Sequence, residues 1–207
     1  MNGKIRYGLG AAGLALVIGA TTVMAQQPQT VRVRGTIEKV DGNVMTVKSR
    51  EGATLTIKQG DKFRVQGMAK ASLADIPVDT FIGVTAMPQP DGSVKAIAIH
   101  IFTAQQRAVV PQRHGPWDFQ PGSTMTNAVV GSKVSATDGN VLMVKYKDGE
   151  KKVVVTPQTT IVKVVPGDQS EVKAGAKIII MGARKQPDGT LVAPNIYVGK
   201  DGIAPPM

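Results

Sequence analysis

Apolar and polar residues alternate along much of the chain beyond residue 28. In VRVRGTIEKV (31–40), Val31, Val33 and Ile37 fall on one side of an extended chain, and the charged residues and threonine between them fall on the other. This period of two is typical of a β-strand with one buried face. The segments 44–49, 53–58, 63–67, 81–87 and 93–102 show the same β character, so the pattern predicts an all-β protein.

Short turn motifs separate these strands. Asp41-Gly42 predicts a tight turn, because glycine tolerates positive φ and the aspartate side chain can bond to its own backbone. Glu51-Gly52 and Gln89–Gly92 divide the later strands in the same way. Five or six short strands in a unit this small have to curl and close, which favours a small OB-like β-barrel.

The chain contains two copies of this unit. VDGNVMTVKSREG (40–52) returns as TDGNVLMVKYKDG (137–149), and MPQPDGSVKAIAI (87–99) returns as RKQPDGTLVAPNI (184–196). The offset is 97 positions both from Asp41 to Asp138 and from Asp91 to Asp188. We therefore expect two tandem OB-like barrels of five to six strands each, one over 28–103 and one over 127–202. A connector (104–126) would join them, and a disordered tail (203–207) would follow.

The first 25 residues have the pattern of an export signal. Lys4 and Arg6 form a positive region, residues 9–18 an apolar core, and Val23-Met24-Ala25 a small-residue cleavage site. The apolar run is shorter than the roughly 20 residues that cross a bilayer. We expect a signal peptide over 1–25, a mature chain without a transmembrane segment, and a periplasmic or secreted location.

These motifs also carry a family resemblance. The chain resembles a family of exported bacterial proteins with repeated OB-like domains of unknown function, on three features: the Asp41-Gly42-Asn43 turn, the glycine near the second hairpin, and Pro90-Asp91-Gly92 followed by Ala96. Their partners lie 97 positions later. Because these motifs are turn chemistry, the resemblance implies a fold and no reaction.

Composition narrows the possible partners. The formal charge is +10, or +8 without Lys4 and Arg6, which favours an envelope protein or an anionic polymer as partner. Lysine and arginine mostly alternate with other residues along strands, as on a solvated face. Nucleic acid is not expected in an exported protein with so few aromatic rings for base stacking. The absence of cysteine excludes disulfides and thiolate ligands.

The inventory of catalytic groups is thin. More than half of the aspartates precede glycine and belong to turns, and no nucleophile, metalloprotease or phosphate-loop motif is present. We therefore expect no enzymatic activity and no cofactor.

Two groups of residues are candidates for ligand binding. His100 lies on the last strand of the first unit, and Tyr197 occupies the equivalent position of the second. The two units therefore place an aromatic ring with a polar atom at the same position of their last strand. The simpler interpretation is a half-buried ring that packs the barrel end, and the alternative is a binding surface.

The second group lies in the connector, RHGPWDFQPGSTM (113–125). It holds His114, Trp117 and Asp118 between prolines that stiffen the chain. One interpretation is a strap, with Trp117 and Phe119 buried between the barrels. The other is a groove for a ligand or soft metal lined by His114, Trp117 and Met125. Against a copper site, the other methionines are scattered; these are Met45, Met68, Met87, Met143 and Met181.

These observations favour a non-enzymatic binding or scaffolding protein of the bacterial cell envelope. The alternative is a periplasmic carrier of a small ligand or a copper-type metal that uses the connector and His100. The sequence leaves the ligand, any bound metal and the oligomeric state open.

Overall fold

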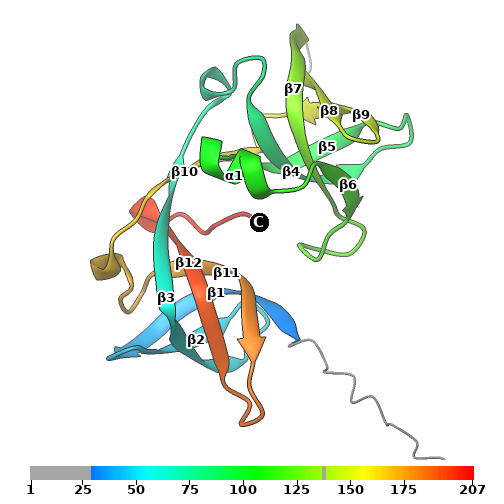
Figure 1. The fold of residues 1–207 in the computed structure, drawn as a ribbon. Coiled ribbons are helices and arrows are strands. Elements are labelled where there is room, and N and C mark those ends of the chain that lie inside the picture. Colours follow the sequence, from blue (N-terminus) through cyan, green and yellow to red (C-terminus); the bar gives the residue numbers. More distant parts are fainter. Residues whose placement is uncertain (1–28, 137–138) are drawn as a thin grey trace, which may run out of the picture.

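A computed structural model describes residues 29–136 and 139–207, and it confirms the all-β class (Figure 1). The strands are β1 (Thr30–Asp41), β2 (Val44–Ser49), β3 (Thr54–Lys70), β4 (Phe81–Pro88), β5 (Val94–Ile101), β6 (Arg113–Pro116), β7 (Thr124–Ala136), β8 (Gly139–Tyr146), β9 (Gly149–Val155), β10 (Thr160–Pro166), β11 (Lys177–Lys185) and β12 (Leu191–Gly199). One helix, α1 (Ala104–Val109), and three single 3-10 turns at 73–75, 169–171 and 200–202 complete the described chain. None of its helices is long and apolar enough to cross a membrane. The expected signal peptide (1–25) and the turn residue Asp138 lie outside the described residues.

The alternating pattern has the predicted effect on most strands. Val33 and Ile37 of β1 and Met45 and Val47 of β2 are buried in one core. Val31, predicted on the same face, is instead 37% exposed. The reason is a register shift of β1 against β11 between Val31 and Val33. At the turn after β1, Gly42 has φ of 57°, the conformation for which a glycine was expected there.

Five strands close a β-barrel in the order β1-β2-β3-β12-β11. Its neighbours are antiparallel except for β3 and β12, which run parallel, and β11 pairs with β1 to complete the circuit. Strands β4, β5, β7, β8 and β9 form a second circuit, which is completed by a short parallel pairing of β5 with β9 at Val94↔Val153 and Lys95↔Val154. Each circuit encloses its own apolar core.

Each circuit contains strands from both halves of the chain. The closed barrel takes β1–β3 from the first half of the chain and the β11–β12 hairpin from the second. The other circuit takes the β4–β5 hairpin from the first half and β7–β9 from the second. The units expected over 28–103 and 127–202 therefore do not coincide with the circuits. The physical reason lies in β3, whose 17 residues continue straight out of the barrel and carry the chain to the other circuit (Figure 1).

The two halves cross where β3 meets β10. Gly67 pairs with Val165 and Met68 with Val164, antiparallel. Because Val164 and Val165 are the repeat equivalents of Gly67 and Met68 at the offset of 97, the pairing has the self-complementary register of a two-fold axis. A third apolar cluster, which includes Met68 and Val164, lies at this crossing.

Two segments differ from expectation. The tail (203–207), expected to be disordered, ends between the two circuits with Met207 4% exposed in the third cluster (Figure 1). Burial of the Met207 side chain supplies the reason. The connector (104–126) contains a helix that was not predicted from sequence. This helix, α1, begins after Thr103, whose hydroxyl accepts a hydrogen bond from the Gln106 amide, 3.2 Å away, and the Gln106 side chain caps Thr103 in return.

The exchange of hairpins predicts that one repeat cannot fold as a monomer. A fragment of residues 29–103 would leave β1–β3 without β11–β12 and β4–β5 without β7 and β9. We expect this fragment to be unfolded or to form a homodimer in which two copies exchange hairpins. Light scattering and circular dichroism distinguish these outcomes from a folded monomer, which would contradict the topology. Co-expression with residues 104–207 is the control and should restore a one-to-one complex.

Candidate functional site

A cavity of about 320 Å³ lies between the two circuits, beside the crossing of β3 and β10. Its wall is mostly apolar and includes Phe102, Val110, Pro111, Met125, Met181 and Met207. Arg32, Gln106, Arg113, Trp117 and Asn127 contribute polar groups. Three residues singled out from sequence, His100, Trp117 and Tyr197, also line this cavity. The cavity is therefore where the repeat-equivalent rings and the connector meet.

His100 is held deep in this wall. Its side chain is 3% exposed, and its ring packs edge-on against Phe102 with ring centroids 4.3 Å apart. On the facing strand β4, Gly83 provides the space: a Cβ there would overlap the imidazole. Burial lowers the pKa of His100 to about 3, so the ring is neutral at neutral pH. The sequence interpretation of a half-buried ring that reaches water underestimated this burial.

The His100 ring has no hydrogen-bond partner in the described part of the chain, whereas its repeat equivalent does. The Tyr197 hydroxyl accepts a hydrogen bond from Gln106 Nε2, 3.0 Å away, and burial raises the pKa of this phenol. Gln106 belongs to α1, so the connector helix fixes one ring of the pair. A neutral imidazole without a protein partner offers one donor and one acceptor to whatever occupies the cavity.

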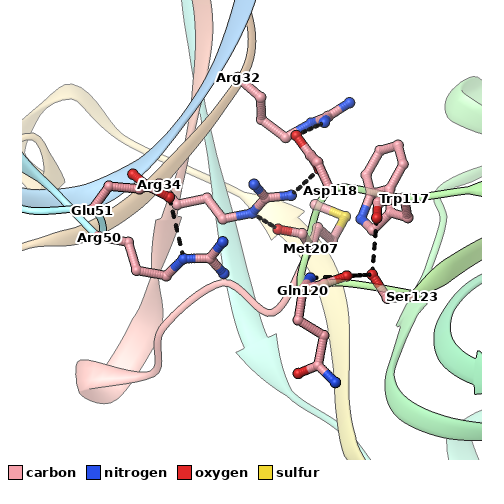
Figure 2. Close-up of polar contacts among 9 residues, drawn as sticks. All are labelled: Arg32, Arg34, Arg50, Glu51, Trp117, Asp118, Gln120, Ser123 and Met207. Atoms are coloured by element: carbon pink, nitrogen blue, oxygen red, sulfur yellow. Dashed lines mark hydrogen bonds and ion pairs between the residues drawn. The ribbon is translucent and has the colours of Figure 1, made fainter.

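The connector residues Trp117 and Asp118 are fixed by two arginines of β1 (Figure 2). The Arg32 guanidinium lies over the Trp117 ring, 3.9 Å from its centroid, and donates to Asp118 at 2.5 Å. Arg34 donates to the other oxygen of Asp118 at 2.8 Å and, through Nε, to the carbonyl oxygen of Met207. One carboxylate therefore ties the connector and, through Arg34, the C-terminal residue to the barrel.

Burial and the arginines act in opposite directions on Asp118. Burial raises the pKa of this carboxyl, while hydrogen bonds and charge from Arg34 and Arg32 lower it, and the net shift is downward. Arg34 is 9% exposed, although the alternation of β1 predicted a solvated face for it. The reason is that the outer face of this barrel is covered by the connector and the C-terminal tail at this point.

The loop that carries Trp117 is closed on itself. The Ser123 hydroxyl donates to the Trp117 carbonyl at 2.9 Å and accepts from the Gln120 amide at 3.1 Å, and the Trp117 amide donates to the Ser123 carbonyl at 2.8 Å. Trp117 Nε1 is buried and has no acceptor among the described residues. These contacts fix the shape of the loop and place the indole at the cavity wall. Trp117 and Phe119, which the strap interpretation expected to be buried, are half-buried.

His114 is not brought to the cavity. It lies on β6 with Nδ1 2.8 Å from the Thr126 hydroxyl and its ring 6.0 Å from that of Tyr146. Burial, and then the charge of Lys151, lower its pKa. The residues that sequence reasoning missed are Arg32, Arg34, Gln106 and Met207. The capping motif at Thr103 and Gln106 could have revealed α1, while no local signal marks the burial of Arg34 or Met207.

The groups at the cavity that could bind a metal ion are methionine thioethers and an imidazole. The described residues contain no group of three or more histidines, aspartates and glutamates that could hold a metal ion. Met125, Met181 and Met207, distant in sequence, nevertheless line the same cavity as His100. The scatter of methionines along the sequence counted against a copper site, but the fold brings these three methionines to one cavity.

Comparison of the chain with protein-family models, with curated proteins and with solved structures found no match. The functional argument therefore rests on the geometry of the cavity and its surroundings.

The network around Asp118 predicts a pH-dependent contribution to stability. Asp118→Asn should lower the free energy of unfolding by about 1 kcal/mol at neutral pH, because Arg34 loses a charged acceptor while Asp118 itself is 53% exposed and partly screened. Since the folded-state pKa is depressed, this contribution is present above the ordinary aspartate pKa and is lost as pH falls through the folded pKa.

Urea unfolding of both proteins at neutral and strongly acidic pH measures this difference. Asp61→Asn is the matched control, because Asp61 is exposed and has no ion pair in the described structure. A loss of the same size at both pH values would show that the carboxylate charge is not responsible.

Proposed function

We propose that this chain is a non-enzymatic binding protein, exported to the bacterial cell envelope, that holds a small and mostly apolar ligand in the cavity between its two circuits. The observation that carries this proposal is a cavity of about 320 Å³ with an apolar wall and a buried His100 that no described residue hydrogen-bonds. Small-molecule sites characteristically combine such a wall with a few placed polar groups.

The architecture supports a more specific proposal about the fold. In the closed barrel, the three-stranded meander β1–β3 is followed around the circuit by β12 and then by β11, the two strands of a hairpin. The neighbours β3 and β12 are parallel. The other circuit repeats this order. This is the order of an OB-type barrel, so we propose two OB-like barrels that exchange hairpins and a relationship to the exported family that the turn motifs resemble.

The proposed location rests on the first 25 residues, whose charged, apolar and small-residue regions follow the order of a signal peptide. A cavity-based ligand is preferred to an envelope polymer or protein because these connector groups already have partners within the chain: Arg32 lies over Trp117, and Arg32 and Arg34 both donate to Asp118.

A soft metal ion is the second candidate ligand. It is favoured by the thioethers of Met125, Met181 and Met207 and the neutral imidazole of His100, which line one cavity. Thioether and imidazole ligands together suit Cu(I).

The cavity predicts binding of a neutral apolar fluorophore such as N-phenyl-1-naphthylamine. Because Trp117 is the only tryptophan and lines the cavity, energy transfer from it should report the bound probe. Val110→Phe, which adds volume at the wall, should weaken binding by about tenfold or more. Val78→Phe is the control, since Val78 is 59% exposed and lies outside the cavity. Equal affinity in Val110→Phe and the parent would refute the cavity as the site.

The metal candidate predicts tight binding of one Cu(I) ion, measured by competition with a chromogenic Cu(I) chelator under anaerobic reducing conditions. Met181→Leu and Met207→Leu conserve volume and should each weaken binding by about tenfold or more. Met143→Leu, on β8 and away from the cavity, should have no effect. Binding that all three variants retain unchanged would place any copper elsewhere.

A further inference from the structure

We infer that the ligand of the cavity between the two circuits is an amphiphile with an apolar body and an oxyanion head, such as a carboxylate. This inference rests on the proposed function and adds to it the chemical class of the ligand. Three features of the cavity support it: the sign of its charge, the excess of hydrogen-bond donors, and the way in which the protein holds its own Met207.

The charged side chains that line the cavity are positive. Arg32 and Arg113 line it, and no aspartate or glutamate is among its lining residues. Asp118, which is not a lining residue, accepts from both Arg32 and Arg34. Arg113 is exposed and has no ion pair with any acid in the described chain, so its guanidinium is available to an anion at the cavity wall.

The polar atoms left without partners here are mainly donors. Arg32 Nε and Trp117 Nε1, both on lining residues, are buried with no acceptor in the described structure. Neutral His100 adds one N–H and one acceptor nitrogen. A buried donor without an acceptor is costly, so a group rich in acceptor oxygens is the complementary ligand chemistry.

Met207 shows how this region holds such chemistry. Its apolar side chain is buried and lines the cavity, while its carbonyl oxygen accepts from Arg34 Nε (Figure 2). An apolar group and an oxygen acceptor are thus already bound together beside the arginines of β1. A ligand with an alkyl body and a carboxylate would use the apolar wall and Arg113 in the same combination.

Displacement of N-phenyl-1-naphthylamine by octanoate, 1-octanol and octylamine tests the inference in the full mature chain. These three competitors share the alkyl body and differ in the head group. We expect octanoate to displace the probe at concentrations about tenfold lower than 1-octanol or octylamine. We expect Arg113→Gln to weaken displacement by octanoate by about tenfold and to leave 1-octanol unchanged.

Arg184→Gln is the matched control. Arg184, on β11, is also exposed and has no ion pair in the described chain, but it does not line the cavity. Octanoate affinity equal to that of 1-octanol, or lost equally in Arg113→Gln and Arg184→Gln, would overturn the head-group inference while the cavity remains a binding site. Failure of the probe itself to bind would overturn the proposed function, and this inference with it.

Discussion

The two circuits of this protein, one of them the closed barrel, close only with strands taken from the other half of the chain. The β11–β12 hairpin pairs with β1 and β3, and the β4–β5 hairpin pairs with β7 and β9. The backbone groups along each meander edge would otherwise be unpaired. The two circuits are therefore joined through β3, which belongs to the closed barrel at one end and crosses β10 at the other. This connection fixes the faces that the circuits turn toward each other, and the cavity forms between those faces.

The contacts between the two circuits, the connector and the tail are polar at the edge of this region and apolar inside it. Asp118 joins Arg32 and Arg34 of β1 to the connector, and Arg34 also holds the Met207 carbonyl. Behind this network, Met207 packs with Met68, Val162 and Val164. A buried arginine is stable only when its donors are engaged, so the connector and the tail act as required partners of Arg34. Covering Arg34 in this way also gives the cavity one of its walls.

Strand content and turns could be predicted from sequence, because alternation and Asp-Gly pairs are local signals. The exchange of hairpins could not. The β4–β5 and β11–β12 hairpins are repeat equivalents with the same apolar pattern, so either hairpin satisfies the alternation of either meander. For the same reason, the pattern of β1 predicted an outward Arg34 but could not indicate that this outer face meets another part of the chain. Three of the five candidate residues meet at the cavity because strand ends and connector converge there. His114, two residues before Pro116, instead packs on β7.

Two rings 97 positions apart, His100 and Tyr197, line the cavity, and their surroundings differ. Tyr197 accepts a hydrogen bond from Gln106 of α1, whereas the corresponding place after β12 in the second half holds only the 3-10 turn at 200–202. His100 sits over Gly83 and is neutral, and its ring has no hydrogen-bond partner among the described residues. A two-fold arrangement with identical rings would present the same group twice to a ligand. The hydroxyl of one ring is thus held by the connector, whereas the ring nitrogens of the other have no hydrogen bond among the described residues, so the two sides of the cavity differ chemically. The connector, which lies outside both repeats, is what breaks the symmetry: it supplies Gln106, Arg113 and Trp117 to the wall.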